Sequence, residues 1–149
     1  MKPGRVVIML AGKYAGRKAM VVKIHDEKKE DFNLDKKFQN CIVVGIRKYP
    51  RKVTRRMSKK RVEKYCRVKP FVKYVNMNHM ICTRYLINID DDLKNKISED
   101  KMKDVAQRKE MRKDIKDYLN GKYAALAVPQ NKEDKTASHV EFFFKKLKF

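Results

Sequence analysis

The sequence predicts an α+β fold, in which a small β-barrel is followed by a helical and extended C-terminal region. Two observations support this prediction. Five short runs rich in β-branched and aromatic residues fall within residues 1–89, and closing such strands into a barrel removes their exposed edges. Beyond residue 90 the periodicity becomes helical. We therefore predict two parts, a barrel over residues 1–89 and a C-terminal region over residues 90–149.

The predicted strands are separated by loops with glycine, proline or polar residues. Two apolar runs, Val6–Leu10 and Ala19–Ile24, enclose a loop that contains Gly12 and Gly16, which indicates strand, loop and strand. An acidic stretch without periodicity, Asp26–Asp35, predicts a solvated loop. The remaining strands are expected at Cys41–Ile46, Phe71–Val75 and Arg84–Ile89, the last two joined by a polar connection at Asn76–Thr83.

Two helices are expected. Ser58 is a suitable N-cap for a short helix over about residues 58–67. A long helix is expected from Ser98, with Asn120-Gly121 as its stop. The apolar positions of the long helix form only a thin, interrupted stripe, so we expect it to lie on another surface and to bury little on its own barrel.

The distribution of charge is the strongest functional signal. The chain of 149 residues carries 39 Lys or Arg against 18 acids, a net charge of +21. Thirteen of these cations and one acid, Glu63, fall in the 27 residues Arg47–Lys73, a net charge of +12. Such a density of like charge opposes compaction unless a polyanion is near. Nucleic acid is favoured as this polyanion, with an anionic membrane or an acidic protein as alternatives.

Several classes of protein are not expected. No apolar run approaches the roughly 18–20 residues of a membrane span, and the N-terminal run Val6–Ala11 is shorter than the ~7–15 residues of a signal-peptide core. Cys41, Cys66 and Cys82 are widely spaced without a CxxC pair. We therefore expect no disulfide, no metal site and a reducing compartment.

Catalysis is not expected either. The three histidines are far apart in sequence, and none belongs to a metal or triad pattern. Asp90–Asp92 are adjacent acids that would point in different directions. No nucleotide fingerprint is present, so we predict no enzyme activity, no cofactor and no small-molecule substrate.

The loop between the first two strands is a candidate site for phosphates. Gly12 and Gly16 permit positive φ and a close backbone approach, so Lys13, Arg17 and Lys18 could lie against a phosphate backbone. An ordinary hairpin turn with solvated lysines is the alternative.

The basic stretch suits neutralisation of a nucleic-acid backbone, because arginine can also stack or fork onto bases. A polycation in which residue order is irrelevant is the alternative. Apolar and aromatic residues are expected to tether the segment to the barrel, which argues against a polycation in which order is irrelevant. These residues are Tyr49, Val53, Met57, Val62, Tyr65 and Phe71. The candidate residues of this stretch are Arg47, Lys48, Arg51, Lys52, Arg55, Arg56, Lys59, Lys60, Arg61, Lys64 and Arg67.

The first turn of the short helix has a distinctive charge. Lys59, Lys60 and Arg61 oppose the helix macrodipole there. A phosphate bound to the free N–H groups of this helix end would neutralise them. A solvated basic face is the alternative.

The remaining candidates are scattered. Asn78 and His79 could bind RNA, although a structural role in their loop is equally compatible. The run Phe142–Phe144 favours a core or protein contact over stacking on bases. The further candidate cations are Arg84, Lys145 and Lys146.

Parts of the chain resemble known sequences. The segment PGRVVIMLAGKYAGRKAMVVKI resembles a KOW motif, with Ala19 in place of its usual final glycine. The blocks VVGIRKYPRKVTRRMSKKR, KPFVKYVNMNHMICTRYLINI and FFFKKLKF then resemble the eukaryotic-type large-subunit ribosomal protein twenty-seven family. Cys82 stands where this family usually has Pro, Ser58 stands where it has Gly, and Asp90–Ser138 is poorly matched.

The resemblance implies both fold and function. The KOW motif implies an SH3-like barrel. The family implies a structural constituent of the cytoplasmic large ribosomal subunit that binds and stabilises rRNA and supports translation. Its partners would be rRNA and neighbouring ribosomal proteins, with no membrane and no homo-oligomer, and it would pass through the nucleolus during assembly. A free-standing KOW module that acts in transcription or ribosome assembly is the alternative.

Overall fold

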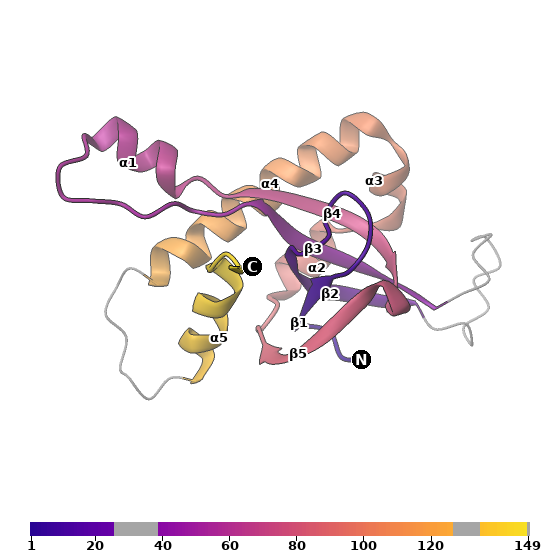
Figure 1. Ribbon diagram of the computed structural model, residues 1–149. Helices are drawn as coiled ribbons and strands as arrows, with labels where there is room; N and C mark the ends of the chain where they lie inside the picture. Colours follow the sequence, from indigo (N-terminus) through magenta and orange to yellow (C-terminus); the bar gives the residue numbers. More distant parts are fainter. Residues whose placement is uncertain (26–38, 127–134, 149) are drawn as a thin grey trace.

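One five-stranded antiparallel sheet forms the centre of the fold (Figure 1). In this computed structural model, the described residues are 1–25, 39–126 and 135–148. The strands are β1 (Arg5–Met9), β2 (Lys18–His25), β3 (Asn40–Lys48), β4 (Lys69–Asn76) and β5 (Met80–Leu86), in the order β4-β3-β2-β1-β5. The three-residue 3-10 helix η1 (Met77–His79) joins the two edge strands, β4 and β5, so the sheet curves back toward itself. This arrangement confirms the α+β class and is consistent with a small barrel-like KOW fold.

Five α-helices accompany the sheet in the described part of the chain. They are α1 (Lys59–Cys66), α2 (Asp91–Lys96), α3 (Glu99–Lys103), α4 (Val105–Leu126) and α5 (Lys135–Phe144). In Figure 1, α1 lies at the tip of a long projection, whereas α4 and α5 lie beside the sheet. The predicted acidic loop at Asp26–Asp35 lies outside the described residues.

Both faces of the sheet are buried, because successive side chains of each strand point to opposite faces. One cluster gathers residues from all five strands inside the curve of the sheet: Val7, Met9, Ala19, Val21, Cys41, Val43, Phe71, Val75 and Met80. The neighbouring residues Val6, Met20 and Val44 belong to a second cluster, which also contains side chains of the C-terminal helices. Burial on both faces explains the continuous apolar run at Cys41–Ile46.

The last strand differs from its predicted position. β5 begins at Met80, not Arg84, and ends at Leu86 rather than Ile89. The polar residues of Asn76–Thr83 suggested a long connection, but the turn takes only three residues. The Thr83 hydroxyl of β5 donates a hydrogen bond to the Val6 carbonyl of the neighbouring strand β1 at 2.7 Å.

The predicted long helix is two helices. The break lies at Asp104, whose carboxylate accepts hydrogen bonds from the backbone N–H groups of Ala106 (3.2 Å) and Gln107 (3.3 Å). The expected stop at Asn120-Gly121 is wrong, since α4 continues to Leu126. The Asn120 side chain instead accepts a hydrogen bond from the Val68 N–H at 3.3 Å.

The expectation that this helix buries little on its own barrel is also wrong. Met111, Ile115 and Leu119 of α4 are buried and join the second cluster. Their spacing of four residues makes a narrow stripe, and α4 uses that stripe to pack against β4. The sheet is therefore covered by a helix from its own chain.

Helix α5 carries the phenylalanine run near the end of the described residues. The phenylalanines of α5 lie in the core, with Phe143 and Phe144 buried, as expected for this run. The Phe142 ring stacks on Tyr85 of β5, with ring centroids 3.9 Å apart. The segment 124–138 has no clear period in the sequence. Its residues 127–134 lie outside the described part. The short helix α2, which the sequence did not predict, buries Leu93.

Candidate nucleic-acid interface

A long projection between β3 and β4 (Figure 1) carries a dense run of cations. We call residues 49–68 the basic arm. Its base is anchored, because Tyr49 and Val68 are buried, and Phe71 is buried just beyond it. The predicted tethering along its length is not found: Val53 is 39% exposed, and no residue of α1 is buried. The arm therefore extends away from the sheet, and its cations can meet a partner from several sides.

The cations of the arm form no ion pair with the described residues. In the described part of the chain, the ion pairs join Lys94 to Asp91 and Lys122 to Asp90, both in the C-terminal region. Ahead of the arm, Arg47 is exposed and Lys48 is half-buried. The sequence-predicted cations that the structure exposes on the arm are Arg51, Lys52, Arg55, Arg56, Lys59, Lys60, Arg61, Lys64 and Arg67.

Two arginines of the arm are organised around one ring. Arg51 and Arg61 lie 5.5 and 5.7 Å from the ring centroid of Tyr65, and the Arg51 N–H donates to the Tyr65 carbonyl at 2.9 Å. The hydrogen bond and charge of Arg61, followed by those of Arg51, lower the pKa of the Tyr65 hydroxyl. The two guanidinium groups thus form a small cationic centre on the arm, which suits a phosphate.

Ser58 precedes α1 at the predicted N-cap position. Its carbonyl accepts from the N–H groups of Arg61 and Val62 at 3.0 Å each, but its hydroxyl makes no capping hydrogen bond. The helix start is therefore confirmed, whereas the side-chain cap expected from the sequence does not form.

The glycine loop, residues 10–17 between β1 and β2, adopts the backbone that its glycines allow. Gly12 and Gly16 have φ of 80° and 71°, in the region that favours glycine. The Gly16 N–H donates to the Met9 carbonyl at 2.7 Å, and the Tyr14 ring stacks on Phe71 with centroids 3.8 Å apart. Lys13 is exposed at the tip. Arg17, just beyond Gly16, is half-buried with its guanidinium 5.8 Å from the Tyr49 centroid.

Lys18 differs from the other sequence-predicted cations because it is buried. It is only 1% exposed, and its ammonium donates to the backbone carbonyls of Phe142 and Lys145 (2.6 Å for the latter). Its Nζ is 3.6 Å from the Phe142 ring centroid. Burial, followed by the charge of Lys145, lowers the pKa of Lys18 to about 8. The donors of this lysine are therefore directed into the protein, toward the end of α5.

The other predicted residues lie at three further places. Asn78 and His79 are exposed on η1, which adjoins the glycine loop because the Leu10 N–H donates to the His79 carbonyl at 3.0 Å. Arg84 is exposed on β5, 5.2 Å from the Tyr85 centroid. Lys145 and Lys146 are exposed after α5.

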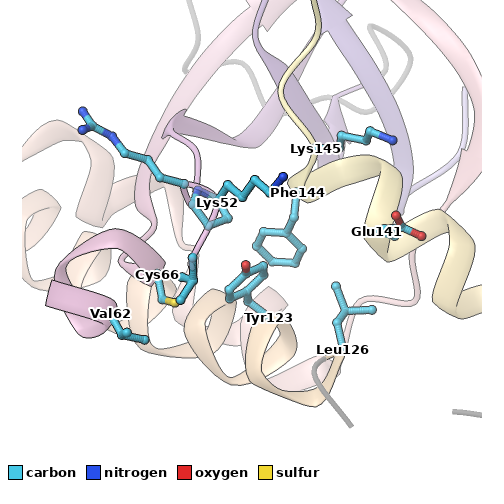
Figure 2. A pocket seen from close by; sticks show the side chains of 11 residues that line it. Lys52, Val62, Cys66, Tyr123, Leu126, Glu141, Phe144 and Lys145 are labelled. Carbon is cyan, nitrogen blue, oxygen red and sulfur yellow. The ribbon is translucent and has the colours of Figure 1, made fainter. Parts of the chain in front are cut away.

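An open groove of about 670 Å³ separates the basic arm from α4 and α5 (Figure 2). The rings of Tyr123 and Phe144 lie together inside it, with centroids 5.2 Å apart, and Lys52 reaches toward Phe144. The sequence did not indicate Tyr123, because it lies beyond the expected helix stop. The groove is lined by Pro50, Arg51, Lys52, Val53, Val62, Cys66, Tyr123, Leu126, Glu141, Phe144 and Lys145.

The polar groups elsewhere show no metal-binding arrangement. Within residues 1–25, 39–126 and 135–148, no three His, Cys, Asp or Glu side chains converge in a way that could hold a metal ion. The three cysteines are free thiols, and burial raises the pKa of Cys41 to about 11. Of the helices that the structure describes, none combines the length and apolarity needed to cross a membrane.

Taken together, the fold and surface define a strongly cationic α+β protein built on a barrel-like, KOW-type sheet. Comparison with known proteins gives the family. The Ribosomal L27e protein family matches residues 6–149. Over 149 residues, the whole of this chain and 97% of the relative, the chain is 44% identical to the large ribosomal subunit protein eL27 of Tetrahymena thermophila. The chain therefore belongs to the Ribosomal L27e protein family, and the family match includes the segment 90–138 that the sequence blocks matched poorly.

Proposed function

We infer that this chain is a structural constituent of the large ribosomal subunit and that it supports translation by binding and stabilising rRNA. The family and the relative's name support membership of the subunit. The observation that carries rRNA binding is the basic arm, whose exposed cations have no acidic partner in the described residues. An RNA backbone supplies the missing negative charge and releases counterions as it binds.

The proposed rRNA surface has a centre and two outer parts. The centre is the basic arm with its Arg51 and Arg61 pair around Tyr65. The glycine loop and η1 form one outer part, with Lys13, Arg17, Asn78 and His79. The other outer part contains Arg84, Lys145 and Lys146. Lys18 is left out, because its ammonium is bonded inside the protein.

We also propose that the two parts of the chain have different functions. Residues 1–89, with α1 inserted at about residues 58–67, hold the RNA-binding barrel and its arm. Residues 90–149 cover the sheet and present surfaces to neighbouring ribosomal proteins. The protein acts without a cofactor, small-molecule substrate or turnover, and not as a homo-oligomer. It works in cytoplasmic ribosomes and passes through the nucleolus during assembly.

Gradient sedimentation of cell extract tests the proposal. The protein should co-migrate with large subunits and stay bound at moderately high salt. A free-standing KOW module of transcription or ribosome assembly would instead be found only in free or pre-ribosomal fractions, and that result would overturn the ribosomal function.

Binding to purified large-subunit rRNA tests the mechanism. The affinity should fall steeply with salt, by about 0.7–0.9 log units per log unit of salt for each phosphate contact. A shallow dependence would contradict binding dominated by phosphates.

A further inference from the structure

A small cavity between the glycine loop and α4 has a lining that the proposed surface does not account for. It has a volume of about 160 Å³ and lies beside β4, an edge strand of the sheet. This volume is below the ~300–1,000 Å³ of sites for drug-sized ligands, so a small group is the fitting occupant. The cavity is lined by Tyr14, Phe71, Val72, Arg108, Met111 and Arg112.

Two arginines of α4 give this cavity its charge. Arg108 and Arg112 are four residues apart, so they lie on the same face of the helix. The Arg112 Nε donates to the Arg108 carbonyl at 3.0 Å, which orients its guanidinium. The lining contains no acid, and neither arginine belongs to an ion pair among the described residues.

The Arg108 side chain has an unsatisfied donor. Its Nε is enclosed by protein and has no hydrogen-bond acceptor, which is costly for a buried polar group. An anion in the cavity would compensate the charge of the guanidinium, and the planar fork of arginine matches a phosphate in geometry as well as in charge.

The glycine loop closes the other side of the cavity. Tyr14 is held there by its stack on Phe71. A further cation lies near the loop, since a side-chain Cβ at Gly12 would be 3.5 Å from the Lys73 Nζ. The cavity therefore lies between two elements that both favour a negatively charged group.

We propose that this cavity binds one phosphate group of the rRNA backbone between α4 and the glycine loop. The proposal rests on rRNA binding as the proposed function, and it adds α4 to a surface otherwise made of the barrel, its arm and the chain end. An RNA backbone is favoured over an acidic protein side chain, because the neighbouring glycine loop carries the exposed Lys13 and lies near Lys73.

Paired substitutions with a matched control test this site in the full-length protein. Arg108→Gln with Arg112→Gln removes two charges and keeps polar side chains. Lys109→Gln with Lys113→Gln makes the same change, at the same spacing, on exposed positions of the same helix. Affinity for purified large-subunit rRNA is measured against salt concentration, and circular dichroism checks that each variant is folded.

The arginine variant should bind rRNA several-fold more weakly, with a salt slope smaller by about 0.7–0.9, which corresponds to one phosphate. The lysine variant should change the slope less. Equal slopes for the two variants would overturn the site while leaving rRNA binding intact. Failure of the unaltered protein to bind rRNA would instead overturn the proposed function, and the site with it.

Titration with inorganic phosphate gives a readout that does not depend on folded RNA. At constant ionic strength, the NMR signal of the Arg108 Nε–H group should shift with phosphate and not with chloride. Absence of this shift would overturn the site. The variant Tyr14→Trp fills the cavity with a larger ring and should abolish the shift, so a shift that persists in this variant would also overturn the site. A phosphate shift combined with an unchanged rRNA slope would assign the cavity to free phosphate and overturn the rRNA proposal.

Discussion

Gly45 shows how a single residue can fix the packing inside the barrel. A Cβ at this position would lie 2.3 Å from the Phe71 Cζ and 2.8 Å from the Lys18 carbonyl oxygen. The same Phe71 ring carries Tyr14 of the glycine loop. The absence of a side chain at Gly45 therefore determines the position of the loop as well as that of the strand.

Replacing Gly45 with Ala should destabilise the protein by about 1–3 kcal/mol, as overpacking of a core does. Gly121→Ala is the matched control, because nothing lies within 4 Å of its added Cβ. Inside a helix that change should stabilise by about 0.5–1 kcal/mol. Urea unfolding measures both, and equal effects of the two substitutions would contradict the close packing of Phe71 on Gly45.

Lys18 should give the stability of the protein a distinctive pH dependence. Its pKa is lowered to about 8 in the folded state from an ordinary 10.5. Between these values the unfolded chain binds more protons at this group, so its contribution to the free energy of unfolding rises with pH. Lys18→Met removes this contribution.

The test compares urea unfolding of the two proteins from pH 7 to 10. The free energy of unfolding of the unaltered protein, relative to Lys18→Met, should increase as the pH passes from about 8 toward 10.5. A difference that is constant with pH would show that Lys18 keeps its ordinary pKa, and one that shrinks would show that its pKa is raised; either result would contradict the lowered pKa.

At the scale of elements, α1 is the helix whose proposed function depends most on an external partner. It has no buried residue, and its first turn consists of cations at the unfavourable end of the helix dipole. Packing on the sheet does not stabilise this helix, so its charges are available to an external phosphate.

Lys59→Glu with Lys60→Glu should weaken binding to large-subunit rRNA and reduce the salt slope by about 0.7–0.9 for each phosphate that the variant no longer binds. The control is Lys101→Glu with Lys103→Glu, an equal charge change at exposed positions of α3. If the α1 variant binds like the unaltered protein at every salt concentration, no phosphate lies at the start of α1.

The elements also show where sequence reasoning succeeds. The strands at Cys41–Ile46 and Phe71–Val75 could be predicted because β-branched and aromatic side chains mark them. The path of α4 through Gly121 could not, because the tertiary contact of Asn120 with Val68 overrides a local stop signal. The burial of Lys18 could not be predicted for a related reason. Its hydrogen-bond partners, the carbonyls of Phe142 and Lys145, are more than 120 residues away in the sequence.

In the molecule as a whole, the sheet and the C-terminal helices share one apolar cluster. Val6 and Met20 of the sheet join Leu93, Ile115 and Phe143 in it. The proposed functional division between residues 1–89 and 90–149 is therefore crossed by continuous packing. We expect the two parts to unfold together.

Ile115→Ala should cost about 2–5 kcal/mol, because Ile115 is fully buried. Far-ultraviolet circular dichroism and tyrosine fluorescence should still report one coincident transition. Val105→Ala is the control, since Val105 is 56% exposed, and it should change stability by less than about 0.5 kcal/mol. Separate transitions for sheet and helices would contradict shared packing.

The bond between Lys18 and the end of α5 has a consequence for how the chain is made. A ribosome synthesises β2 early, yet the carbonyls that receive its lysine belong to Phe142 and Lys145. Until those residues emerge, the nascent hairpin keeps an unpaired ammonium beside an uncovered apolar face. The packing around Lys18 is therefore completed only after Phe142 and Lys145 have left the ribosome.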